Sequence, residues 1–125
     1  MENEKYLLVD FNSERWKGIT KKSIRSAYRD LCKRIKKGER IYGQIDHPET
    51  MLDDLHLISH EIFDIEIEDM TKIFGSVRYN NSHGIAAEVL INSKKYKFGI
   101  RGIGTQQNEV INLTKIISFD VIPNI

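Results

Sequence analysis

The clearest pattern of apolar and polar positions in the chain predicts an α-helix between Thr20 and Lys37. Apolar residues recur there at spacings of three and four, which places them in one stripe along a helix: Ile24, Ala27, Tyr28, Leu31 and Ile35. Thr20 or Ser23 can cap the first turn, and Gly38 provides the stop after the last one. Charged residues, most of them basic, cover the other faces of this helix.

Alternation of apolar and polar residues predicts strands over most of the remaining chain. It is longest in residues 55–68, where we expect a bulge, and the turn Asp69-Met70-Thr71 joins this strand to the next. The predicted strands cover residues 5–11, 40–46, 55–68, 73–79, 95–101 and 110–122. A short helix is expected at 84–91 and a loop at 102–109. Residues 1–125 are therefore predicted to form a single α+β domain, a mostly antiparallel β-sheet or barrel of about six strands with two helices.

Composition is that of an ordinary globular domain. Apolar residues make up 40% and charged residues 30% of the 125 residues. No apolar run reaches the length of a membrane span and no signal peptide opens the chain, so we expect no membrane association. The single cysteine, Cys32, excludes an internal disulfide and fits a reducing cytoplasm.

Charge is segregated along the chain, although the formal net charge is only +1. Residues 15–40 carry eleven Lys and Arg against Asp30 and Glu39, whereas residues 41–75 carry nine Asp and Glu against Lys72. Segregation of this kind bears on the choice of partner more than the net charge does.

Three glycines interrupt the strand and loop predicted near residue 100, in the stretch Phe98-Gly99-Ile100-Arg101-Gly102-Ile103-Gly104. Glycine inside a strand marks a place where a backbone or a ligand comes close. Amide N–H groups exposed by a turn after Arg101 could bind a developing negative charge. The stretch resembles the nucleophile motif of the bacteriophage prohead (capsid maturation) proteases, serine enzymes distantly similar to herpesvirus capsid proteases. That motif reads roughly Phe/Gly-Ser-x-Arg-Gly-x-Gly, and Gly99 stands where it has its serine.

Further short blocks resemble the same family, in the family's order. They are Gly43-Gln44-Ile45-Asp46-His47-Pro48-Glu49, Ile58-Ser59-His60, Gly75-Ser76-Val77 and the closing strand from Ile117 to Pro123. Together with the glycine-rich stretch they cover residues 40–123. The ordered set implies the prohead-protease fold for this chain.

The resemblance also implies roles for particular residues. His60 stands where the general base would take a proton from the serine hydroxyl and return it to the leaving amine. Arg101 and Gly102 follow the nucleophile position, where backbone amides would hold the oxyanion. The group that would orient His60 is left open between Asp64 and Asp120.

Gly99 decides the chemistry that the resemblance implies, because it offers no oxygen or sulfur nucleophile. Loss of the serine from such a triad costs on the order of a millionfold in kcat. We therefore expect a catalytically inactive pseudoprotease of phage origin that needs no cofactor and binds another protein, either a phage head protein or a host factor. A homo-oligomer is left open, and the expected location is the host cytoplasm or the phage prohead. The alternative is a capsid maturation serine protease whose nucleophile has been replaced.

The basic helix and the histidine spacing bear on two other kinds of site. The basic helix, with Arg25, Arg29 and Lys33, could bind nucleic acid through phosphate contacts, or the acidic region of a second copy. A nucleic-acid-binding accessory protein is therefore a second alternative, although the segment has too few aromatic residues for base stacking. His56 and His60 are four residues apart, which in a strand separates them by about 13 Å. We therefore predict no metal site.

Overall fold

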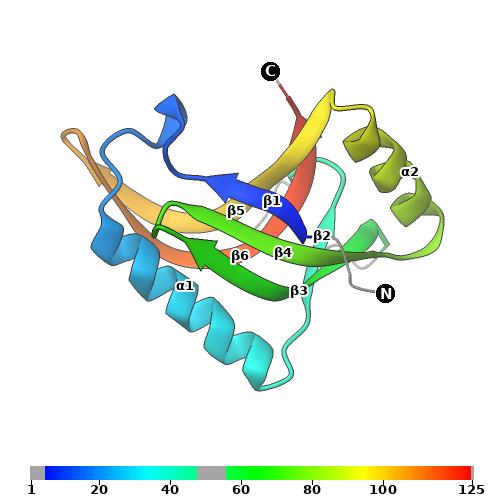
Figure 1. The fold of residues 1–125 in the computed structure, drawn as a ribbon, viewed down its shortest axis with the longest axis horizontal. Helices are drawn as coiled ribbons and strands as arrows, with labels where there is room; N and C mark the ends of the chain where they lie inside the picture. Colours follow the sequence, from blue (N-terminus) through cyan, green and yellow to red (C-terminus); the bar gives the residue numbers. More distant parts are fainter. Residues whose placement is uncertain (1–4, 48–55, 125) are drawn as a thin grey trace.

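The structure is a computed structural model that describes residues 5–47 and 56–124 (Figure 1). Six strands, two α-helices and one short 3-10 helix make up these residues. Their order is β1 (Lys5–Asp10), η1 (Glu14–Trp16), α1 (Lys21–Lys36), β2 (Ile41–Gln44), β3 (Ile58–Glu68), β4 (Lys72–Tyr79), α2 (Asn81–Asn92), β5 (Tyr96–Gln107) and β6 (Val110–Pro123). The α+β class predicted from the sequence is confirmed.

The strands form two antiparallel sheets. One has four strands in the order β1-β4-β3-β2, and the other is the long hairpin β5-β6. The sheets meet where the chain leaves β2: Ile45 forms a parallel bridge with Val121, and the N–H of Asp46 donates to the Val121 carbonyl at 2.7 Å. Within the described residues no ladder joins β1 to β5, so the strands curve around the core without closing a barrel.

α1 has the ends that the sequence predicts. The Thr20 hydroxyl oxygen accepts a hydrogen bond from the N–H of Ser23 at 3.2 Å, which satisfies one of the free donors of the first turn. At the other end Gly38 has a φ of +97°, a conformation that glycine adopts without steric cost. The apolar stripe of the helix packs toward β6 in the core.

Arg34 ties the C-terminal half of α1 to the hairpin. Its guanidinium donates to the carboxylates of Asp30 and Glu39 at 3.0 and 2.9 Å, and also to the carbonyl of Ile116 in β6. Arg34 therefore has a structural role, unlike a basic residue that is free to bind a partner. The other cations of α1 remain available to solvent or to a partner.

One apolar core lies between the two sheets and α1. Its largest fully buried apolar side chains come from β1, α1, β3, β4 and β6: Leu8, Ile24, Leu31, Ile62, Ile73, Ile116, Phe119 and Val121. The helix α2 packs mainly against β3, on the other side of the molecule from α1 (Figure 1). The core thus holds the hairpin against the four-stranded sheet, which positions the polar residues described below.

The predicted loop at residues 102–109 is wrong. β5 continues through Gly102 and Gly104 to Gln107, and Asn108 then turns the chain with a φ of +57°. A Cβ added at Gly102 would lie only 2.7 Å from the carbonyl oxygen of Lys115 in β6. These glycines therefore allow two strands to approach closely at register shifts, and they do not end the strand.

Two other elements differ in detail from the prediction. The long strand predicted at 55–68 is β3, and its expected bulge is confirmed by a register shift between Phe63 and Glu66 with Asp64 at a φ of +46°. Residue 55 lies outside the described residues. The helix predicted at 84–91 is longer, because Asn81 accepts a hydrogen bond from the N–H of His83 at 2.9 Å and starts the helix three residues earlier.

Candidate functional site

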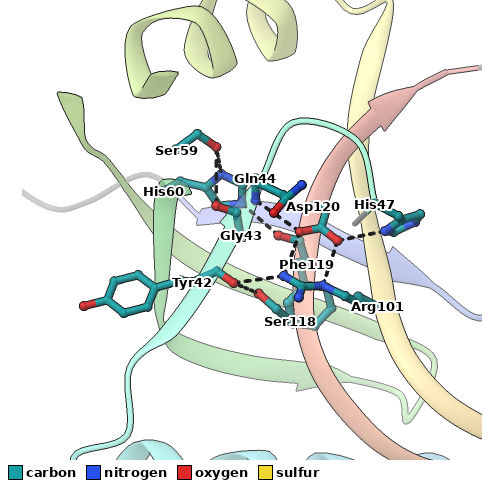
Figure 2. Close-up of polar contacts among 10 residues, drawn as sticks. All are labelled: Tyr42, Gly43, Gln44, His47, Ser59, His60, Arg101, Ser118, Phe119 and Asp120. Carbon is teal, nitrogen blue, oxygen red and sulfur yellow. Dashed lines mark hydrogen bonds and ion pairs between the residues drawn. The ribbon is translucent and has the colours of Figure 1, made fainter. Parts of the chain in front are cut away.

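Asp120 in β6 is a fully buried carboxylate that accepts hydrogen bonds from β5 and from residues 44–47 (Figure 2). Arg101 in β5 donates from Nε to Oδ2 at 3.0 Å and from Nη2 to Oδ1 at 3.1 Å. The backbone N–H of Gln44 donates to Oδ1 at 3.1 Å, and Nδ1 of His47 lies 2.8 Å from Oδ2. Four hydrogen bonds, two of them from the Arg101 guanidinium, compensate the cost of removing this charge from water.

The register of the hairpin explains why these groups meet. Gly99 is the cross-strand partner of Asp120, and Arg101 is the partner of Ser118. Residues two apart in a strand point to the same face, so all four positions share one face of the hairpin. On that face the Ser118 hydroxyl donates to the carbonyl of Tyr42 in β2. The chain leaving β2 then supplies the remaining partners of the carboxylate.

His47 lies between Asp120 and the side of Gly99 on which a Cβ would stand. A Cβ built on Gly99 would lie 3.8 Å from Nε2 of His47. Because an ionised carboxylate only accepts hydrogen bonds, Nδ1 carries the proton toward Asp120, and Nε2 of the neutral ring is an acceptor. The His47 side chain is 36% exposed. The geometry is that of a carboxylate and an imidazole aligned on a third position that has no side chain.

Ile122 fills the space beside Gly99. A Cβ built on Gly99 would lie 2.3 Å from Cδ1 and 2.9 Å from Cγ1 of Ile122, which is closer than carbon atoms approach. Any side chain at position 99 therefore requires Ile122 to move. Because the nearest atom is the end of a flexible side chain, a rotamer change or a shorter residue at position 122 would make room.

His60 lies in the core, with both ring nitrogens bonded inside the protein. Nε2 donates to the carbonyl of Phe119 at 2.8 Å, and Nδ1 accepts from the Ser59 hydroxyl at 2.7 Å. Burial lowers the pKa of His60 below its ordinary value of 6.5. The ring is therefore neutral, and its nitrogens are directed at these two partners rather than at position 99. His60 links the four-stranded sheet to the hairpin.

Gly43 makes room for this link. A Cβ at Gly43 would lie 2.1 Å from the Phe119 carbonyl oxygen and 2.2 Å from Nε2 of His60. Figure 2 shows Gly43 beside the imidazole, with His60 and His47 on opposite sides of Asp120 in this view. The two histidines thus occupy different environments, one in the core and one partly open to solvent.

Arg101 and Gly102, predicted as the oxyanion region, both lie within β5. Arg101 is 3% exposed. Its side chain donates hydrogen bonds to Asp120 and, from Nη2 at 3.3 Å, to the carbonyl of Tyr42. Gly102 faces Ile116 in the ladder with β6. The structure thus brings Gly99 and Arg101 together with Asp120, while the role of the backbone amides stays a prediction.

The predicted basic residues of α1 lie apart from this cluster. Arg25, Arg29 and Lys33 are exposed at intervals of four residues, and therefore form a row along one face of the helix. None of the polar contacts around Asp120 involves them.

The pairing of His47 with Asp120 was missed by sequence reasoning. The sequence offers Asp120 as one of two candidates for orienting His60, and His47 belongs to a block that resembles the protease family. The signal was present in that His-Pro block, but the pair is separated by 73 positions and depends on the contact between β2 and β6. Pro48 and Glu49 of the same block lie outside the described residues.

Among residues 5–47 and 56–124, no group of three or more His, Cys, Asp or Glu side chains could hold a metal ion. In the same ranges, no helix is both long and apolar enough to cross a membrane.

Comparison with known proteins identifies a structural relative. No protein-family model matches the sequence, and no curated protein sequence matches it. Among solved structures, the chain is similar to the bacteriophage T4 capsid assembly protease gp21, with a TM-score of 0.74 and 15% sequence identity. The match covers 94% of this chain and 79% of the other. This similarity shows that the chain has a fold like that of a phage capsid protease.

Proposed function

We propose that this chain is a catalytically inactive, prohead-protease-like phage protein that acts by binding another protein. One observation carries the proposal: Asp120 and His47 are aligned on Gly99, a position with no nucleophile. A similar fold in a phage capsid assembly protease is consistent with an origin among such enzymes.

The proposal reassigns the general base from His60 to His47. In a serine protease the base accepts the hydroxyl proton on Nε2, while a carboxylate holds Nδ1 and stabilises the imidazolium that forms. The bond from His47 Nδ1 to Asp120 and the approach of Nε2 to Gly99 fit these two roles. His60 instead has a carbonyl on Nε2, and its lowered pKa disfavours the imidazolium that general base catalysis requires.

Two residues together account for the proposed inactivity. Gly99 lacks the atom that would attack a peptide carbonyl, and Ile122 occupies the volume that a side chain at position 99 would need. In this proposal the protein keeps the peptide-binding surfaces of a protease, and its partner is a phage head protein or a host factor.

Restoring the missing hydroxyl tests the proposal. We would prepare the double variant Gly99→Ser/Ile122→Ala and measure covalent labelling by a fluorophosphonate probe, with the parent and Ile122→Ala as matched controls. The double variant should label, and neither control should. Adding His47→Gln should abolish labelling, whereas adding Ser118→Ala, on the same face of the hairpin, should leave most of it.

Each alternative gives a different result in this assay. Labelling of the parent chain would show that it is an active enzyme and overturn the proposed inactivity. A folded double variant that does not label would show that position 99 does not correspond to the nucleophile position of the proteases. The single variant Gly99→Ser should label less than the double variant, and equal labelling of the two would contradict the role given to Ile122.

A further inference from the structure

A groove of about 350 Å³ runs past Gly99. It is lined by residues 7–10 of β1, residues 13–16 around η1, residues 97–100 of β5, and Ile122. In Figure 1 the blue segment from β1 to the 3-10 turn faces the first half of β5. We call this surface the edge groove.

Both strands that border the edge groove have a free edge. β1 pairs with β4 and β5 pairs with β6, and in the described ranges no ladder joins β1 to β5. The two strands touch through the rings of Tyr6 and Phe98, whose centroids lie 5.6 Å apart. A strand paired on one side keeps the N–H and C=O groups of alternate residues directed outward, where an extended chain can pair with them.

The side chains of the edge groove suit a peptide better than a polyanion. Its walls include Val9, Phe98 and Ile100, which are nearly buried, and Leu7, which is 45% exposed. Charges of both signs also line it: Asp10, Glu14, Arg15 and Lys97. Carboxylates beside the groove repel phosphate groups, whereas alternating side chains of an extended peptide can match apolar walls and a mixed rim.

Gly99 lies at the middle of the β5 segment in the groove. The space that a side chain at position 99 would take is filled by Ile122, which is itself a wall of the groove. Residues 97–100 offer an edge long enough for about four residues of an extended chain, at roughly 3.3 Å per residue. The groove is therefore continuous with the position on which His47 and Asp120 are aligned.

From these features we infer that the edge groove binds an extended segment of a partner protein, which adds as a strand to the free edge of β5 at residues 97–100. This inference rests on the proposed function and specifies it: the protein partner is held by backbone pairing, with apolar side chains against Leu7 and Ile100. Because position 99 lacks a nucleophile, the bound segment remains intact.

The test uses peptides of about eight residues, long enough to span the groove. A phage-displayed random library is selected on the whole chain, and the recovered peptides are synthesised with both termini blocked. Affinity is compared between the parent, Leu7→Arg and Ile103→Arg. The last is the matched control, since Ile103 is 46% exposed on β5 but lies outside the groove. Backbone hydrogen exchange with and without peptide then locates the bound segment.

We expect Leu7→Arg to raise Kd by about tenfold or more and Ile103→Arg to leave it within about twofold. Bound peptide should slow the exchange of amides in residues 97–100. The inference is overturned if no peptide is recovered, if both variants bind alike, or if protection appears only elsewhere. Protection elsewhere would still agree with a protein-binding role. Cleavage of a groove-bound peptide by the parent chain would overturn the proposed inactivity and leave the groove assignment standing.

Discussion

Gly99 and Asp120 are direct cross-strand partners in the β5–β6 hairpin, so the carboxylate and the side of Gly99 on which a Cβ would stand share one face. Side chains at directly opposed positions start about 5 Å apart. His47 lies within reach of both, with Nδ1 at 2.8 Å from Asp120 Oδ2 and Nε2 directed toward position 99. A ladder between two strands thus sets the distance between the carboxylate and position 99, and the residues after β2 supply the imidazole.

Asp120→Asn should destabilise the protein strongly. The substitution keeps the shape of the side chain but leaves the buried guanidinium of Arg101 without its counter-charge. Loss of one member of a buried pair lowers the free energy of unfolding by about 3–5 kcal/mol. Urea denaturation of the variant and the parent measures this difference.

The matched control is Asp30→Asn on α1. Asp30 also accepts from an arginine, Arg34, at 3.0 Å, but its side chain is 48% exposed. An exposed pair of this kind contributes about 0–1 kcal/mol. Equal losses for the two variants would contradict the structural role assigned to Asp120.

His60 should make stability depend on pH. Burial lowers its pKa in the folded protein, so the unfolded chain binds a proton at higher pH than the folded one. The free energy of unfolding that depends on neutral His60 is therefore fully present above pH 6.5 and falls as the pH drops below this value toward the folded pKa. The loss can reach about 1.4 kcal/mol per pH unit.

Urea denaturation from about pH 8 to 5 measures this dependence. In His60→Gln the slope below pH 6.5 should be shallower than in the parent. If that variant does not fold, the NMR titration of the His60 ring in the parent decides: its resonance should not titrate at 6.5 while the protein stays folded. Titration at that ordinary value would contradict the buried, neutral ring.

Gly43→Ala should break the link between the two sheets. The added methyl group would lie 2.1 Å from the Phe119 carbonyl oxygen and 2.2 Å from the His60 ring, so the bond between them has to lengthen. We expect a loss of more than about 2 kcal/mol in the free energy of unfolding, measured by urea denaturation.

Gly38→Ala provides the comparison for this substitution. Gly38 has a φ of +97° but no atom within 4 Å of an added Cβ. Only backbone strain is therefore introduced, which costs about 1 kcal/mol. A larger loss at position 38 than at position 43 would mean that Gly43 is not needed for close approach.

The exposed row of cations on α1 should be dispensable for folding. The triple variant Arg25→Glu/Arg29→Glu/Lys33→Glu should keep nearly the urea midpoint of the parent, because these side chains lie on the surface. It should also lose salt-sensitive retention on a phosphate resin, since this row concentrates positive charge on one helix face.

A second triple variant controls for overall charge. It reverses three exposed lysines outside α1, namely Lys94, Lys95 and Lys115. If both variants lose retention equally, binding to phosphate reflects net charge and the row has no special part in it. Selective loss in the α1 variant would favour the nucleic-acid alternative over a solvated helix face.

Local signals were sufficient to predict much of the fold. The helix at 20–37 carries a cap at Thr20, an apolar stripe and a terminating Gly38, and all three act within a few residues of one another. The predicted loop at 102–109 failed for a different reason. Glycine is unfavourable in an isolated strand, but in this hairpin β6 passes so close that a Cβ at Gly102 would meet Lys115.

The candidate site was harder to predict, because it depends on register between distant strands. The alternation of residues 55–68 correctly predicts that His60 lies in a strand. Alternation alone does not show which groups of other strands will contact its ring. The aligned histidine, His47, follows a strand of only four residues, and only the contact of β2 with β6 brings it to Asp120. A contact between residues 73 positions apart leaves no pattern in the local sequence.

The junction where Ile45 bridges Val121 also has a consequence for folding. Residues from both sheets complete the cluster around Asp120, so neither sheet can assemble it alone. His47 and its partner are 73 positions apart, and contacts of such sequence separation form after local ones because a long loop must first close. We therefore expect the two local pairs, β3–β4 and β5–β6, to order first, and the alignment on Gly99 to appear with a later docking step.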